Sequence, residues 1–225
     1  MMIREKIIQS LLTILLYKAP NIDLSIEEQK LCKQLYNQTL KSSNNQIPYH
    51  LSLPKYKFLY YLLHHESVLL HGSTNKNIHV FEPRDQTLFN GEMTKAIFAT
   101  ADPIWPFFYA TLNKSKIDGN IRNGSISHNG KQWFHYYSLT RATLTNNPWT
   151  NGMIYILPKD HFTHVHSDKV QFNEWTSTKV VSPIAKLEVN PDDFYFLDKV
   201  ATHKTDEKML KTWFLYKIRT IFKSY

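Results

Sequence analysis

The chain has 225 residues, of which 42% are hydrophobic and 14% aromatic. That composition supports a sizeable core and excludes a largely disordered protein. The net charge of +8 favours acidic partners such as nucleotides, nucleic acid or an anionic surface, but the lysines are scattered, so a solvated basic surface explains most of it. Cys32 is the only cysteine, which excludes a disulfide framework and a Cys-rich zinc site, and we expect a cytoplasmic location.

Residues 1–66 are predicted to form an N-terminal helical region. The segment 1–17 carries apolar residues at helical spacing, which predicts an amphipathic helix rather than a signal peptide. The run is too short to cross a bilayer, and no other segment is a candidate membrane span. Ser25-Ile26-Glu27-Glu28 is a capping box that should begin a second helix, and Pro54 suits the start of a third.

Residues 67–225 are predicted to form a mostly antiparallel α+β domain. Short β-like runs recur along it, at 68–72, 78–82, 95–100, 120–128, 132–139, 153–157 and 184–189. Asn129-Gly130 predicts a hairpin turn, and Asp102 and Pro103 predict the start of a helix that runs to Leu112.

A last helix is predicted from Asp206 to Phe222. We expect most of its large apolar side chains to face inward, namely Leu210, Trp213, Phe214, Ile218 and Ile221. Its basic residues are Lys208, Lys211, Lys217, Arg219 and Lys223. This pattern favours a docked terminal helix with a solvated basic face over a face that binds nucleic acid or a membrane.

The common nucleotide and hydrolase motifs are absent from the sequence. There is no GxGxxG, no GxxxxGK[ST], no GxSxG and no HExxH. A bound nucleotide would therefore have to be held without a glycine-rich phosphate loop.

The run Val68–Ser73 is the most distinctive segment. Its apolar residues predict a buried strand, but the strand ends in His71-Gly72-Ser73. Glycine lets a ligand approach the backbone closely, and histidine supplies a ring donor or acceptor beside it. These residues predict a small site at the edge of a sheet.

Three segments in this order resemble the ADP-ribosyltransferase superfamily, in its poly(ADP-ribose) polymerase and diphtheria-toxin branch. They are His71-Gly72-Ser73, the run Ala96-Ile97-Phe98-Ala99-Thr100 with the helix after it, and Phe172-Asn173-Glu174-Trp175 followed by Ser182-Pro183 and a further strand. The resemblance covers about residues 68–190. It implies a split, mostly antiparallel sheet and an N-terminal helical appendage.

The resemblance implies that NAD is the substrate and that no metal is needed. Gly72 would pair through its backbone with the nicotinamide carboxamide, and His71 would hydrogen-bond a ribose hydroxyl, with Ser73 beside them. Glu174 would hold the ribose 2′-hydroxyl and stabilise the positive charge that develops as nicotinamide leaves. The residues implied to stack on nicotinamide are Phe98, Trp105, Phe108 and Tyr109. Arg84 is a candidate to reach the pyrophosphate, but the sequence favours a surface pairing of Arg84 with Glu82 or Asp85.

The chain departs from the family pattern at three positions. Ile97 stands where the family has a tyrosine, Trp105 stands near the family's carboxamide-binding serine, and Phe172 disfavours modification of arginine. Three functions therefore stay open. They are ADP-ribosyl transfer to an unidentified protein or nucleic-acid acceptor, binding without catalysis, and an NAD-dependent RNA 2′-phosphotransferase-like activity.

His161, His164 and His166 form a separate cluster. His164 and His166 have the spacing of two ligands on one face of a strand. The positions where a third, carboxylate ligand would follow hold Val170 and Gln171, and Asp168 is too close. We therefore expect exposed histidines and no metal site.

Overall fold

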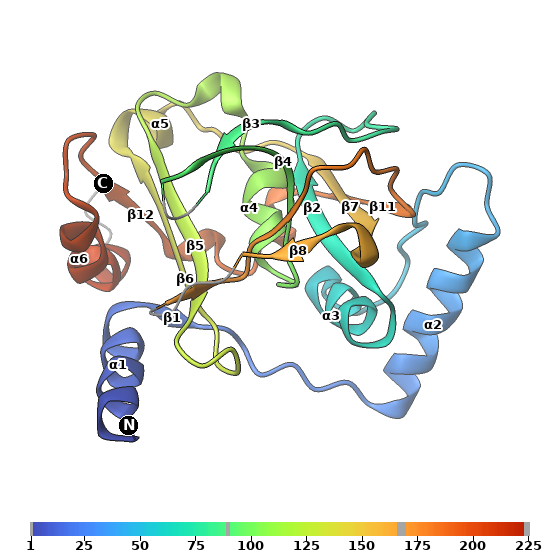
Figure 1. The fold of residues 1–225 in the computed structure, drawn as a ribbon, viewed down its shortest axis with the longest axis horizontal. Helices are drawn as coiled ribbons and strands as arrows, with labels where there is room; N and C mark the ends of the chain where they lie inside the picture. Colours follow the sequence, from blue (N-terminus) through green and yellow to red (C-terminus); the bar gives the residue numbers. More distant parts are fainter. Residues whose placement is uncertain (1, 89–90, 166–169, 223–225) are drawn as a thin grey trace.

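The computed structural model describes residues 2–88, 91–165 and 170–222 and shows an α+β fold with mostly antiparallel sheets (Figure 1). Its α-helices are α1 (Met2–Leu15), α2 (Ile26–Leu40), α3 (Lys55–His65), α4 (Trp105–Thr111), α5 (Arg141–Thr145) and α6 (Met209–Phe222). Four short 3₁₀ turns connect strands, namely η1 (Lys114–Lys116), η2 (Lys159–His161), η3 (Pro191–Asp193) and η4 (Leu197–Lys199).

The strands form three sheets among the described residues. In chain order they are β1 (Tyr17–Lys18), β2 (Val68–Ser73), β3 (Arg84–Thr87), β4 (Met93–Ala99), β5 (Ile121–Ser127), β6 (Phe134–Thr140), β7 (Gly152–Pro158), β8 (Thr163–His164), β9 (Gln171–Phe172), β10 (Trp175–Ser177), β11 (Ala185–Val189) and β12 (Val200–His203). The sheet orders are β1-β6-β5-β9 with β12 also on β6, β3-β4-β10-β8, and β11-β7-β2. Only β12 and β6 pair in parallel among these strands.

One isolated bridge joins the second and third sheets. Leu70 of β2 exchanges both backbone hydrogen bonds with Thr100, just beyond the end of β4, at 2.9 Å each. Because this bridge is antiparallel, His71 to Ser73 continue alongside the last residues of β4, and the His71 ring reaches the Phe98 carbonyl. No ladder pairs β2 with β4 there among the described residues, so the two sheets are bridged at one point and separate beside His71 and Gly72.

Helix α4 lies directly against the backbone of β2 and β7. A Cβ placed on Gly72 would come within 1.9 Å of the Pro106 carbonyl oxygen, and one on Gly152 within 1.8 Å of the Ala110 carbonyl oxygen. No side chain fits at either position, because the helix backbone occupies the space. Gly72 is thus required by packing, apart from any part it has in a site.

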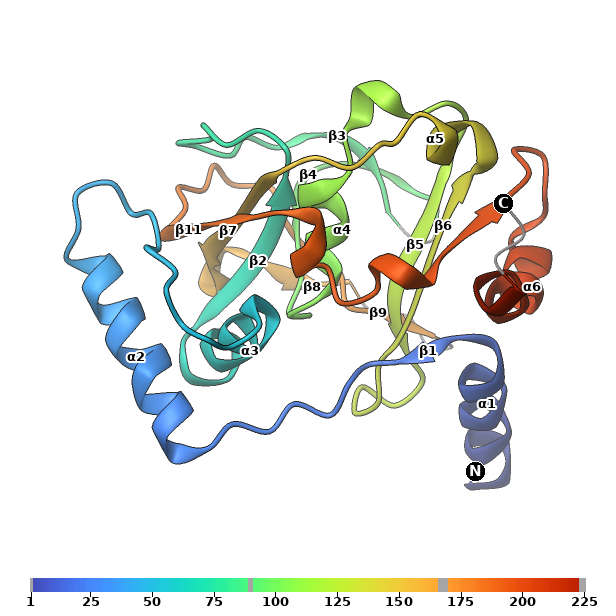
Figure 2. The same ribbon diagram turned by 180° about the vertical axis from the view of Figure 1, so that it is seen from behind.

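The N-terminal helices share their cores with the strands. In the largest hydrophobic cluster, Leu35 of α2 and Phe58 of α3 are buried together with Leu70 of β2 and Phe107 of α4. Helix α1 instead packs beside α6 over the sheet of β5 and β6, at one edge of the molecule (Figures 1 and 2).

Several local predictions are confirmed. The capping box at Ser25 is present, with reciprocal bonds between Ser25 and Glu28. Asn129-Gly130 lies in the hairpin loop that joins β5 and β6, and Gly130 has φ of 69° as a tight turn requires. Asp102 accepts the backbone N–H groups of Ile104 and Trp105. However, α4 begins at Trp105, and the proline of its first turn is Pro106 rather than Pro103.

The expected orientation of the last helix is wrong. The buried residues of α6 are Thr212, Tyr216 and Thr220. Most of the apolar side chains predicted to face inward are exposed instead, namely Leu210, Phe214, Ile218 and Ile221. The buried side carries Thr212, Tyr216 and Thr220, so hydrophobic periodicity favoured the opposite, more apolar side, which the structure leaves exposed.

We expect Gly152→Ala to lower the free energy of unfolding by about 3 kcal/mol, because the added methyl must displace the backbone of α4. Gly91→Ala is the matched control, since a Cβ there meets nothing within 4 Å and only the positive φ of +90° is strained, at a cost of about 1 kcal/mol. Urea denaturation measures both. Equal losses would contradict the close contact between α4 and β7.

Candidate functional site

His71 is held at the end of β2 by the backbone of β4. Its Nδ1 lies 2.6 Å from the Phe98 carbonyl oxygen, and its ring packs edge-on against Phe81 at 4.8 Å between centroids. A carbonyl can only accept, so Nδ1 carries the proton and Nε2 is left as an acceptor. Burial lowers the pKa of His71, and the positive charges of Lys114 and Arg84 lower it further, against the raising effect of the Phe98 bond. His71 is therefore a neutral imidazole near the positive charges of Lys114 and Arg84.

Gly72 directs its backbone polar groups toward the opening between the sheets. Leu70 points its N–H and C=O at Thr100, away from β7. Because backbone groups alternate sides along a strand, those of Gly72, two residues on, point the same way. No strand pairs with Gly72 on that side among the described residues. One donor and one acceptor of Gly72 therefore point to the side of β2 on which Thr100 and the Phe98 carbonyl lie, next to His71.

Glu174 lies on the opposite flank of the same end of β4. The next residue, Trp175, pairs with Ala99, and the Glu174 carbonyl accepts the Val165 N–H at 2.9 Å. The preceding residue, Asn173, accepts the Ala101 N–H through Oδ1 at 2.9 Å. Its own carbonyl and the neighbouring residues Asn173 and Trp175 therefore fix the position of Glu174, and the residue is 9% exposed.

Helix α4 connects the two flanks. Its turn from Pro106 to Ala110 covers Gly72, and Tyr109 in the same turn lies within electrostatic reach of Glu174. Burial raises the pKa of Tyr109 to about 12, with a smaller lowering by a hydrogen bond to Asn123 and a further raising by the charge of Glu174. His71 and Gly72 therefore lie on one flank of the end of β4 and Glu174 on the other, with Tyr109 in the turn of α4 that covers Gly72.

The four predicted stacking residues have different environments. Phe108 is fully buried, with its ring against Tyr137 and Phe194, and is part of the core rather than of a cleft wall. Trp105 is also buried, and its Nε1 donates to Asn123 Oδ1 at 2.6 Å. Phe98 and Tyr109 keep part of their surface exposed. These two are the aromatic rings that a ligand can reach.

The other predicted binding residues lie at the rim. Ser73 is half-buried, and its Oγ accepts the Asn75 N–H at 3.1 Å. Arg84 is exposed at the start of β3, and within the described residues it has no ion pair with Glu82 or Asp85. Lys114 lies in the 3₁₀ turn after α4, and its positive charge lowers the pKa of His71. No pattern in the sequence pointed to Lys114, because only the fold places it near His71.

A buried polar network anchors the start of α4. Asp102 Oδ1 accepts from Ile104 N at 2.7 Å and Trp105 N at 2.8 Å, and Oδ2 accepts from Ser125 Oγ at 2.6 Å. His135 Nε2 lies 3.3 Å from Oδ2, but not at a hydrogen-bonding angle. Asp102 and His135 are both almost fully buried. This network is structural, and the sequence revealed only its helix-capping part.

The histidine cluster does not form a metal site within the described residues. His161 lies 3.9 Å from Asp160, and the His164 ring packs against Trp175. His166 and Asp168 lie outside the described residues. No group of three histidine, cysteine or acidic residues that could hold a metal occurs in the ranges that the structure describes.

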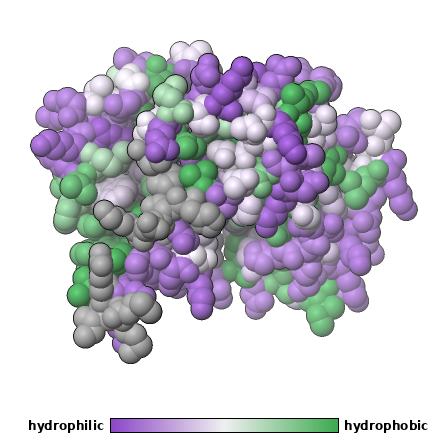
Figure 3. Space-filling view, viewed as in Figure 1, coloured by the Kyte–Doolittle hydropathy of each residue, from purple (hydrophilic) through white to green (hydrophobic). Residues whose placement is uncertain are grey.

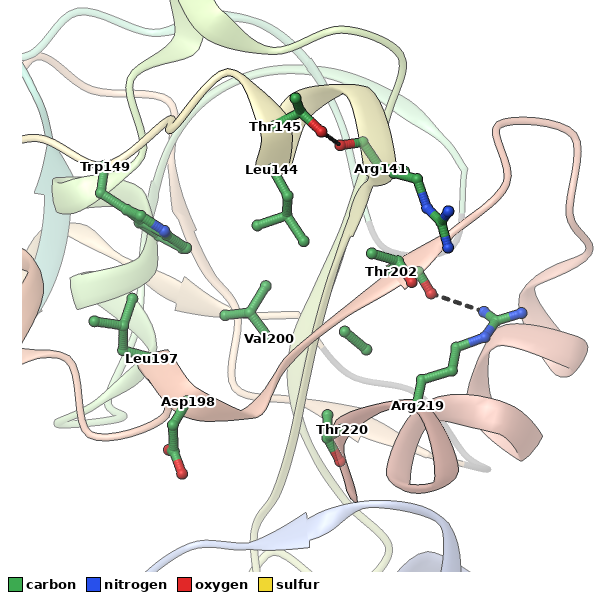
Figure 4. Close-up of a pocket in the computed structure, with 11 residues that line it drawn as sticks. Arg141, Leu144, Thr145, Trp149, Leu197, Asp198, Val200, Thr202, Arg219 and Thr220 are labelled. Carbon is green, nitrogen blue, oxygen red and sulfur yellow. Dashed lines mark hydrogen bonds between the residues drawn. The ribbon is translucent and has the colours of Figure 1, made fainter. Parts of the chain in front are cut away.

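A separate cavity of about 340 Å³ opens between α5, η4, β12 and α6 (Figure 4). Leu144, Trp149 and Val200 contribute apolar walls, and Arg219 donates to the Thr202 carbonyl. The ionisable residues of its lining are Arg141, Asp198 and Arg219, of which Asp198 pairs with Lys199 and Arg219 with Glu207. None of the predicted site residues lines it, and it holds no acid–base pair.

Comparisons with known proteins identify no relative of this chain. No family model matches the chain, and neither the curated proteins nor the solved structures contain a significant match. The class that the fold defines is therefore an α+β protein with a candidate site where two sheets diverge.

We expect Asp102→Ala to lower the free energy of unfolding by about 3 kcal/mol, because it removes the acceptor of the Ile104 and Trp105 N–H groups and leaves the buried Ser125 hydroxyl without its partner. Asp102→Asn keeps an acceptor for the two N–H groups and should cost about half as much. Thermal and urea denaturation of both variants measure the difference. Equal losses would show that capping does not depend on the side-chain oxygen.

We expect acid to destabilise the protein through buried His203. Burial and the charge of Arg122 lower its pKa to about 4, so the unfolded chain binds the proton more readily. Stability is then fully present above about pH 6.5 and falls as the pH drops, by about 2 kcal/mol at pH 5. Urea denaturation at pH 7 and pH 5 should show a smaller loss in His203→Gln, whereas exposed His79→Gln should behave as the wild type.

Proposed function

We propose that this protein is an NAD-dependent ADP-ribosyltransferase that breaks the N-glycosidic bond to nicotinamide. The observation that carries the proposal is the placement of His71-Gly72 and Glu174 on the two flanks of one strand end, with Tyr109 of α4 between them. The same three sequence segments that resemble this superfamily are therefore neighbours in space.

The backbone at the sheet edge suits a carboxamide. Gly72 offers an N–H to the carboxamide oxygen and a C=O to its NH₂ group, which is a complementary pair. The exposed part of the Tyr109 ring is the preferred stacking surface, because Ile97 is buried in the core and cannot supply one. His71, with Nε2 free to accept, suits a ribose hydroxyl.

The reaction requires a negative charge where the ribose becomes cationic. As the bond between the ribose C1′ and the nicotinamide nitrogen breaks, its electron pair leaves with neutral nicotinamide. The Glu174 carboxylate stabilises the oxocarbenium-like sugar while it holds the 2′-hydroxyl. A nucleophile of the acceptor then bonds to C1′ and loses its proton. Arg84 and Lys114, whose charges act on His71, suit the pyrophosphate.

The acceptor of ADP-ribose is a protein or a nucleic acid. Binding without catalysis is the second candidate, because the family tyrosine is replaced by buried Ile97. An RNA 2′-phosphotransferase-like reaction would use the same cleft.

The test is release of nicotinamide from NAD, with and without cell lysate or 2′-phosphorylated RNA. We expect Glu174→Gln to lower kcat at least about 100-fold while NAD binding is kept. The substitution removes the negative charge that stabilises the cationic transition state but leaves a side chain of the same size. Glu188→Gln, on the exposed side of β11 where Glu188 pairs with Lys76, is the matched control and should keep full activity. Gly72 is not a useful test position, since any side chain there collides with α4.

The alternative outcomes separate the candidates. If the wild type binds NAD but releases no nicotinamide, the protein is a binding protein and not a transferase. Nicotinamide release only with 2′-phosphorylated RNA would indicate the phosphotransferase. Equal turnover by Glu174→Gln and wild type would contradict the proposed role of Glu174.

A further inference from the structure

Helix α6 exposes a continuous row of large apolar side chains. Leu210 is 67% exposed, Phe214 61%, Ile218 51% and Ile221 66%. Their spacing of three and four residues places them on one face of the helix, opposite Thr212 and Tyr216, which meet the sheet. Exposed apolar residues are ordinary when they are single, but a continuous row marks an interaction surface.

Helix α1 extends this surface. Ile7, Leu11 and Ile14 are exposed with the same helical spacing. The two helices touch, and Lys217 Nζ donates to the Thr13 carbonyl at 2.7 Å. We call the combined surface the apolar helix face, and its members are Ile7, Leu11, Ile14, Leu210, Phe214, Ile218, Ile221 and Phe222.

The two helices lie at one edge of the molecule with different directions. In both ribbon views α1 stands upright and α6 is seen nearly end-on, so both axes run parallel to that edge (Figures 1 and 2). Figure 3 shows hydrophobic residues gathered along the same edge.

The charges around the apolar helix face are mainly positive. On the two helices, the basic residues with described side chains that have no acidic partner are Lys6, Lys211 and Lys217, against the acidic residue Glu5, while half-buried Arg219 is paired with Glu207. The chain as a whole carries +8. A second copy would bring like charges together, whereas an anionic surface complements them.

We propose that the apolar helix face docks on the surface of an anionic lipid bilayer. The apolar side chains enter the boundary between headgroups and acyl chains, and the lysines contact the anionic headgroups. The contact is peripheral. In the part of the chain that the structure describes, no helix is long and apolar enough to cross a membrane. This inference is independent of the proposed enzymatic function, because it uses none of the residues at the end of β4.

The test is co-sedimentation of the full chain with vesicles of phosphatidylcholine alone or mixed with phosphatidylglycerol. We expect binding to the mixed vesicles that weakens with added salt, and at least tenfold weaker binding to the neutral vesicles. Phe214→Ser with Ile218→Ser should weaken binding to mixed vesicles about tenfold or more, since both side chains would otherwise enter the lipid.

The control is Met93→Ser with Val180→Ser, two exposed apolar residues away from α1 and α6, which should bind as the wild type. Lys6→Gln with Lys211→Gln should weaken binding to anionic vesicles, whereas Lys95→Gln with Lys131→Gln should not. Circular dichroism melting checks that each variant folds.

Three outcomes would overturn the proposal. They are no binding to either vesicle, equal loss in the control pair, or a dimer in light scattering that Phe214→Ser with Ile218→Ser dissociates. The last result would assign the apolar helix face to a second copy.

Discussion

The candidate site depends on the close contact between helix α4 and the backbone of β2 and β7. Gly72 and Gly152 leave no Cβ in the way, so the carbonyl groups of Pro106 and Ala110 reach strand backbone that side chains usually cover. Asp102 fixes where the helix begins, through two backbone N–H groups and Ser125. Because the helix is held at both points, Tyr109 has a defined position relative to Gly72 and Glu174.

The divergence of two sheets has a chemical consequence. A strand inside a sheet forms hydrogen bonds with its neighbours through its N–H and C=O groups, but β2 is bridged to the sheet of β4 only at Leu70 and Thr100 among the described residues. The Gly72 groups point to the same side of β2 and have no strand partner there. His71 is fixed by the same junction, since the Phe98 carbonyl holds its Nδ1 proton and leaves Nε2 to accept. The site is therefore built from backbone geometry as much as from side chains.

Local patterns in the sequence correctly predicted those elements whose conformation depends on residues close together in the chain. The capping box at Ser25, the turn at Asn129-Gly130 and the apolar strand before His71 each depend on neighbouring residues, and each is present. Residues 78–82 were predicted as a strand but form only an isolated bridge between Phe81 and Val181. The strand lies further on, at Arg84–Thr87, where polar residues pair with β4 and gave no apolar signal.

The sequence by itself determined the α+β class, the absence of a glycine-rich phosphate loop, and the pairing of imidazole, glycine and hydroxyl at a strand end. Only the tertiary structure decided which aromatic rings are core and which keep exposed surface, because adjacent Phe108 and Tyr109 both fit a core helix and their exposure depends on what packs on them. It also decided which side of α6 meets the sheet. The more apolar side of the helix is the exposed one, because the sheet accepts Tyr216 and two threonines while Phe214 faces outward.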